Sequence, residues 1–127
     1  MKEVLEFIND VLTSLGIPYE FLEWTQPVRY PYFTGEYSET EPTTESGECD
    51  KYFMLTGFAR GKDALMELED IREKLEKAFP EREGRIATLN SGSVVAIFYS
   101  NALHIPSGEA ELHKIQVNLF IKLWKVV

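Results

Sequence analysis

The residue types that most often carry catalysis or bind metals are few in this chain. Its 127 residues include two histidines, His104 and His113, and one cysteine, Cys49. The histidines follow no HExxH motif and no helical i, i+4 spacing, so a zinc site would need carboxylates from distant parts of the chain. Cys49 lies between Glu48 and Asp50, whose negative charges disfavour a reactive thiolate. These residues therefore predict neither a metal site nor a nucleophile.

Serine, glycine and acidic residues form no catalytic pattern either. No serine lies in a G-x-S-x-G elbow, and the glycines form neither a P-loop nor a dinucleotide fingerprint. The 21 acidic residues supply many carboxylate pairs, so one such pair has almost no specificity. We predict no catalytic residue, no cofactor and no metal. A hydrolase that uses acid catalysis stays open as an alternative with only these carboxylates behind it.

Charge is unevenly distributed along the chain. Residues 1–50 carry eleven acidic and two basic residues, whereas residues 51–127 carry ten acidic and eleven basic residues. The net charge of -8 removes the electrostatic drive for non-specific DNA binding and repels anionic membranes. Sequence-specific nucleic acid and membrane are therefore not expected as partners.

Length and apolar pattern predict one soluble, unexported domain over residues 1–127. No apolar run approaches the ~20 residues that span a bilayer, and the first residues, MKEVLEFIND, lack the basic and then apolar run of a signal peptide. A lone cysteine cannot form an internal disulfide, so the sequence implies no oxidising compartment.

Two segments repeat apolar residues at helical spacing, over residues 4–15 and 62–79. Gly16 and Pro18 follow the first segment, and Gly61 and Pro80 bracket the second, as expected at helix ends. Strand patterns are predicted at 19–24, 32–37, 50–60, 85–89, 93–101 and 113–125.

This order of elements predicts the fold class. Two helices cannot supply the right-handed crossovers of a parallel sheet, so we expect an α+β fold. Its antiparallel or mixed sheet would carry both helices packed on one face, as a two-layer sandwich. Residues 93–101 form a nearly continuous apolar run, typical of a strand that is buried on both faces or central in the sheet, and 102–111 are predicted to be polar or turn-forming. The strand over 113–125 alternates strictly, and 93–101 is its expected partner.

Residues 38–50 form the predicted tip of a hairpin between the strands 32–37 and 50–60. The tip is acidic and has no apolar residue larger than Cys49, so it cannot contribute to the core. A plain solvated loop and a loop that orders on docking to a partner both stay open. A calcium site has enough oxygens but not the D-x-[DN]-x-[DN]-G spacing.

Aromatic residues on one face of the last strand predict a surface for a partner. Phe120 and Trp124 alternate with the apolar set of this strand, and Tyr30–Phe33 adds three aromatic residues next to prolines. A two-layer fold would leave such side chains on the uncovered face of the sheet, where they would resemble the rim of an interface. Alternatively, loop residues fold back and cover them.

Several segments together resemble the small tail-terminator and tail-completion proteins of long-tailed phages and prophages. In chain order they are LGIPYEF, PYFTGEYSE, KYFMLTGFARG, KDALMELEDI, VVAIFY and ELHKIQVNLFIKLWKV. The resemblance covers nearly the whole chain and lies in the order and style of these elements.

The resemblance implies a structural virion protein, not an enzyme. Such minor tail proteins assemble as ring-shaped oligomers, commonly hexamers, that cap the tail tube and connect it to the head. Expected partners are therefore copies of itself and a tail-tube or head-connector protein, in the virion or in the bacterial cytoplasm during assembly. By position, the contacts would involve Tyr32, Phe33, Glu36, Tyr37, Glu39, Glu41, Glu45, Glu48 and Asp50. A small bacterial ligand- or partner-binding α+β module, with the aromatic sheet face as its pocket, is the alternative.

Overall fold

The first helix, α1, spans Lys2–Ser14 in the computed structural model. The structure describes residues 2–39 and 48–125, and for residues 39 and 48–50 it describes the backbone alone. Gly16 follows α1 with a φ of 74°, and the Ile17 N–H donates to the Leu12 carbonyl oxygen at 3.1 Å. This left-handed turn satisfies a carbonyl that the helix end leaves free. The predicted helix and its glycine cap are confirmed.

The second helix, α2, spans Ala64–Ala78 and buries one residue every three or four positions. These buried residues are Ala64, Leu68, Ile71 and Leu75. The helix ends where the Phe79 N–H donates to the Leu75 carbonyl at 2.9 Å, because Pro80 has no N–H to continue the pattern. No helix within the described residues is long and apolar enough to cross a membrane.

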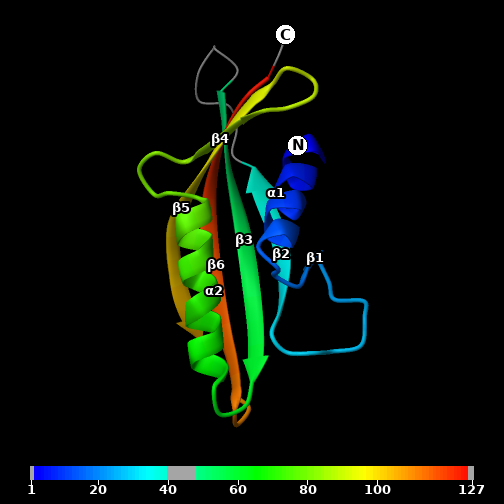
Figure 1. Ribbon diagram of the computed structural model, residues 1–127, viewed down its shortest axis with the longest axis vertical. Coiled ribbons are helices and arrows are strands. Elements are labelled where there is room, and N and C mark those ends of the chain that lie inside the picture. Colours follow the sequence, from blue (N-terminus) through cyan, green and yellow to red (C-terminus); the bar gives the residue numbers. More distant parts are fainter. Residues whose placement is uncertain (1, 40–47, 126–127) are drawn as a thin grey trace.

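Six strands form one mixed sheet in the order β1-β2-β3-β6-β5-β4. Their bounds are β1 Tyr19–Phe21, β2 Tyr32–Glu39, β3 Glu48–Arg60, β4 Arg85–Thr88, β5 Val94–Ile105 and β6 Leu112–Trp124. Among these described strands, β1 pairs with β2 in parallel and the other four pairings are antiparallel. The long strands β3 and β6 therefore lie at the centre of the sheet (Figure 1).

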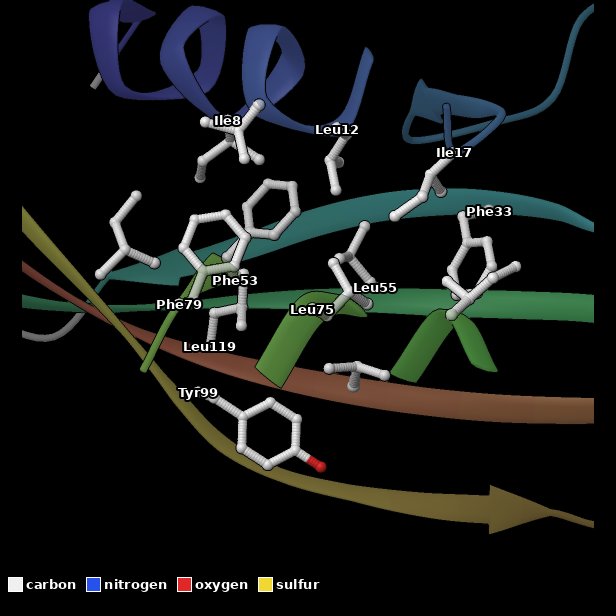
Figure 2. Packing of buried hydrophobic residues seen from close by; sticks show 14 of the residues in the cluster. Ile8, Leu12, Ile17, Phe33, Phe53, Leu55, Leu75, Phe79, Tyr99 and Leu119 are labelled. Atoms are coloured by element: carbon white, nitrogen blue, oxygen red, sulfur yellow. The ribbon is translucent and has the colours of Figure 1, made fainter. Parts of the chain in front are cut away.

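Alternate residues of the long strands face the helices and form the core with them. In β6 the buried residues are Ile115, Val117, Leu119, Ile121 and Leu123, as the alternation predicts. Figure 2 shows Ile8 and Leu12 of α1 facing the side chains of β3 across this core. Both helices contribute to the same buried cluster, so no helix of the described residues covers the opposite face of the sheet, called the outer face below.

The predicted two-layer sandwich is wrong, although the chain does have an α+β fold with a mixed sheet. The sheet curls into a half-barrel, and strand content dominates over helix content. Strands of 12 and 13 residues accumulate the right-handed twist of each strand, so a sheet built from them does not form a flat layer. A β-bulge between Tyr99 and Asn101 bends β5 further.

Two glycines opposite aromatic side chains allow close packing inside the curl. A Cβ atom on Gly57 would lie 2.3 Å from the Phe33 side chain, and one on Gly35 would lie 2.6 Å from Phe53. Both aromatic side chains are fully buried. Because glycine has no side chain, each aromatic ring can lie directly over the neighbouring strand. Glycine is often found at such positions in curved sheets.

The fifth strand differs from its prediction. β5 continues to Ile105, through residues that the sequence predicts as a polar turn, and it lies next to the sheet edge instead of at the centre. The bulge explains the greater length of the strand, because it reverses the alternation: Tyr99 opposes buried Leu119, whereas Asn101 opposes Asn118 on the outer face. A strand predicted from strict alternation therefore ends at the bulge, too early, because the residues after it face the opposite way.

The other boundaries differ at β1 and at the hairpin. β1 ends at Phe21, because Leu22 adopts a φ of 68° and turns the chain away. The predicted hairpin of β2 and β3 is confirmed, but these strands include 38–39 and 48–50, so part of the predicted tip is strand. The remaining tip residues, including Glu41 and Glu45, lie outside the described residues.

Candidate interaction surfaces

The histidines lie apart in the structure. His104 is exposed near the end of β5, and His113 is half-buried near the start of β6. The register places His104 opposite Ile115 and His113 opposite Ala59. Over residues 2–39 and 48–125, no three His, Cys, Asp or Glu side chains group so that they could hold a metal ion.

The outer face of the sheet carries one aromatic cluster near the β5 side, which we call the central cluster. It consists of Tyr52, Phe98 and Phe120 from three adjacent strands. The Phe120 ring centroid lies 5.2 Å from that of Tyr52 and 6.3 Å from that of Phe98. The Lys122 Nζ lies 5.9 Å from the Phe120 centroid. An open depression of about 490 Å³ lies over this cluster, with Arg82 at its wall.

A second aromatic cluster, the β1-side cluster, gathers around Tyr32. The Tyr32 ring centroid lies 5.0 Å from that of Trp24, 5.7 Å from that of Tyr30 and 4.9 Å from that of Phe58. The Arg60 guanidinium lies 5.6 Å from the Tyr30 centroid, a distance typical of cation–π contacts. Burial among these groups raises the pKa of the Tyr32 phenol. Phe58 lies six positions after Tyr52 along β3, so the two clusters are roughly 20 Å apart.

Both edges of the sheet are partly unpaired. β4 pairs only with residues 94–97 of β5, so among the described residues no strand pairs with the outer side of β5 from Ser100 to Ile105. β1 pairs only with residues 33–35 of β2, so within residues 2–39 and 48–125 no strand pairs with the rest of β2 on that side. Leu103, in the unpaired part of β5, is 46% exposed. Unpaired strand edges are templates for another chain.

The backbone of β2 points its hydrogen-bonding groups toward this open edge at alternate residues. The Phe33 N–H donates to the Pro18 carbonyl at 2.9 Å, and the Gly35 carbonyl accepts from the Leu22 N–H at 2.7 Å. Because groups two residues apart point to the same side of a strand, the Tyr37 backbone faces the open part of the edge. The Tyr37 side chain is 37% exposed and stacks on Phe21 at 6.1 Å between centroids.

The structure separates the residues that the sequence proposes as interface. Phe120 is half-buried in the central cluster, Trp124 is 38% exposed beyond it, and Tyr32 belongs to the β1-side cluster. Phe33 is fully buried in the core, so its side chain does not reach the surface.

The acidic interface candidates fall along β2 and β3. Glu36 is exposed on β2 opposite Met54. In the strand register, Glu39 is opposite Lys51, Glu48 is opposite Trp124 and Asp50 is opposite Lys122. For these three acidic residues the structure describes the backbone alone. Glu41 and Glu45 lie outside the described residues altogether.

Sequence reasoning did not find the β1-side cluster as a unit. Trp24, Arg60 and Lys114 contribute to its surroundings, with the Lys114 Nζ 5.4 Å from the Phe58 ring centroid. The alternation of β3 contains a signal for it, since Phe58 and Arg60 occupy exposed or half-buried even positions between buried odd positions. Trp24 belongs to this surface through the loop between β1 and β2, which brings its ring to 5.0 Å from that of Tyr32.

Comparisons with known proteins indicate the fold alone. No protein-family model matches the sequence, and no curated protein matches it. The chain is similar to a solved structure whose name describes no function, with a TM-score of 0.69 and 12% sequence identity. That match covers 94% of this chain and 88% of the other. At this identity the similarity extends to the fold and not to a shared activity.

Proposed function

We propose that this protein is a structural component of the tail of a long-tailed phage or prophage, similar to a tail-terminator or tail-completion protein. In this role it assembles with copies of itself into a ring-shaped oligomer at the end of the tail tube. The observation that carries the proposal is the pair of unlike, partly unpaired edges on one curled sheet. The resemblance of the sequence segments to tail-terminator proteins supplies the biological context.

Two unlike edges favour a head-to-tail contact. If the unpaired part of β5 in one copy pairs with the open edge of β2 in the next, each contact uses two different surfaces. Such heterologous contacts close into a ring-shaped oligomer when the rotation between copies allows it. A curled sheet introduces a rotation at every copy, which supports closure. The net charge of -8 also suits a passage for DNA, because like charges keep the polymer from adhering.

Edge variants test this proposal through the mass of the assembly. Leu103→Lys places a charge on the unpaired part of β5, and Tyr37→Lys does the same on β2. We expect each variant alone to stay monomeric, because charged edge residues oppose strand pairing. A mixture of the two variants retains one intact pair of edges, so heterodimers form and no ring-shaped oligomer closes. Light scattering on a size-exclusion column distinguishes these species.

Leu65→Lys is the matched control for the β5 variant. Leu65 lies on α2 and is 47% exposed, against 46% for Leu103, so the two substitutions remove similar exposed area. The control should assemble like the unmodified protein. If Leu103→Lys and Leu65→Lys had the same mass in solution, this result would contradict an edge-to-edge contact.

A second candidate function, a small ligand- or partner-binding module, is favoured by the depression over the central cluster. Aromatic walls with a few charged groups at the margin are typical of binding sites. Here Phe98 and Phe120 line the depression, with Arg82 and Lys122 as its cations. A protein that stays monomeric at all concentrations and loses a ligand on Phe120→Ala would favour this candidate.

A further inference from the structure

A groove of about 430 Å³ lies beside the loop that connects β1 to β2, separate from the depression over the central cluster. Its walls include the side chains of Trp24 and Tyr30 and the rings of Pro27 and Pro31. Arg29 is also part of the lining and is exposed. The groove thus combines aromatic and proline surfaces with one cation.

Hydrogen bonds hold the loop in shape around this groove. The Glu20 carboxylate accepts from the Thr25 N–H at 2.9 Å and from the Thr25 hydroxyl at 2.6 Å. These bonds favour the ionised carboxylate and lower the pKa of the Glu20 carboxyl. The Trp24 Nε1–H donates to the Pro27 carbonyl at 3.5 Å.

The aromatic walls are also supported from behind. The Tyr32 ring lies 5.0 Å from Trp24 and 5.7 Å from Tyr30, between centroids, so both walls rest on the same side chain. Arg60 lies over Tyr30 and forms an ion pair with Glu109 at 2.8 Å. A groove whose walls are fixed in advance costs less conformational entropy when a ligand binds.

The cation of the groove is available to a ligand. Arg29 makes no ion pair or hydrogen bond with any residue that the structure describes. It is one of only two basic residues among residues 1–50, which carry eleven acidic residues. A guanidinium in such a position pairs with a carboxylate by charge-assisted hydrogen bonds.

We propose that this groove binds an extended, proline-rich segment of a partner protein that carries a glutamate or aspartate next to its prolines. Polyproline II segments dock into grooves lined by aromatic side chains, because they are already extended and lose little entropy on binding. The proline faces pack on Trp24 and Tyr30, and the acidic residue pairs with Arg29. The charge of Arg29 selects an acidic ligand over a basic one.

Fluorescence of Trp24 reports on binding at this groove. The protein has two tryptophans, so a Trp124→Phe background leaves Trp24 as the only reporter. The probe is an acetylated peptide of sequence PPPEPPPEPP. We expect a saturable change in fluorescence below about 1 mM peptide, the range of weak but specific binding. A peptide with glycine and serine in place of every proline should give no saturable change.

Charge reversal tests the role of Arg29. In the same background, Arg29→Glu should weaken binding of the glutamate peptide at least about tenfold, or about 1.4 kcal/mol, and should favour a peptide with lysines at the glutamate positions. Arg82→Glu, an equally charged change at the depression over the central cluster, is the matched control and should leave the affinity unchanged. Circular dichroism checks that both variants are folded.

Three results would overturn the proposal. The first is the absence of a saturable change with folded protein, and the second is equal binding of the peptide that lacks prolines. The third is a change in Trp24 fluorescence that depends on protein concentration without peptide, which would indicate that a second copy covers the groove.

Discussion

Replacing Gly57 by alanine tests the packing inside the curled sheet. In an ordinary strand, this change should stabilise the protein by roughly 0.5–1 kcal/mol, because glycine loses more backbone freedom on folding. Here the added Cβ would lie 2.3 Å from Cε2 and 2.4 Å from Cζ of Phe33. Phe33 is fully buried, so its ring has no free space into which it could move. We therefore expect Gly57→Ala to destabilise the protein.

The size of the loss follows from overpacking. Forcing an extra carbon into a well-packed core costs about 1–3 kcal/mol, which offsets the gain in backbone entropy. For a chain of this length, each kcal/mol lowers the melting temperature by roughly 3–5 °C. Thermal and urea unfolding followed by circular dichroism measure both quantities.

A double-mutant cycle with Phe33→Leu isolates the contact. The smaller side chain alone costs about 1–2 kcal/mol of core packing, but it leaves space for the new Cβ of Gly57→Ala. We expect the double variant to be more stable than the sum of the single changes predicts, by at least about 0.5 kcal/mol. A stabilising Gly57→Ala, or strictly additive effects, would refute the packing of Phe33 over Gly57.

Three further predictions concern ionisable groups. Arg72 donates to Glu69 at 2.7 Å, to Glu76 at 2.7 Å and to the Tyr99 hydroxyl at 3.3 Å, so Arg72→Met should cost about 1 kcal/mol of unfolding free energy in urea. The hydrogen bond from Arg72 lowers the pKa of the Glu69 carboxyl from 4.5 in the folded protein. The ionised Glu69 therefore stabilises the fold above pH 4.5, and this stabilisation is lost as the pH falls through the lowered pKa of the folded state. The difference in melting temperature between the unmodified protein and Glu69→Gln should therefore disappear in acid, and a constant difference would contradict this linkage. Burial raises the pKa of the Tyr19 phenol to about 12. The contribution of the neutral phenol to stability is therefore lost as the pH rises from 10 towards 12. Tyr19→Phe should remove the step at the highest pH from an ultraviolet titration of the tyrosines.

The sequence predicted correctly those helices and strands whose pattern of apolar residues continues without interruption. The apolar stripes of α1 and α2 and the alternation of β6 carry enough information in sequence, because each pattern matches the geometry of one regular element. The glycine after α1 and the proline after α2 fixed their ends. The pairing of β5 with β6 was also predicted correctly.

Features that depend on several strands were not predictable in the same way. The bulge after Tyr99 reverses the alternation of β5, and the left-handed Leu22 shortens β1. The close packing inside the curl places Gly57 opposite Phe33 and Gly35 under the ring of Phe53, a relation that only the register of β2 against β3 defines.

The candidate site was predictable only in part. The even positions of β6 correctly placed Phe120 and Trp124 on the outer face of the sheet. Phe33, taken from its position in an aromatic segment, is a core residue, because alternation places it inside while Tyr32 lies outside. The groove near Trp24 and Arg29 depends on a loop whose shape comes from Glu20 and Thr25, and no local pattern predicts that contact.

The most direct test of the proposed assembly is the mass of the protein in solution. Light scattering on a size-exclusion column, over roughly a hundredfold range of concentration, makes association by mass action visible. We predict a closed oligomer of several subunits for the unmodified protein and for Leu65→Lys, and a monomer for Leu103→Lys. A strict monomer at every concentration, or an oligomer that Leu103→Lys does not disturb, would contradict assembly through the sheet edges.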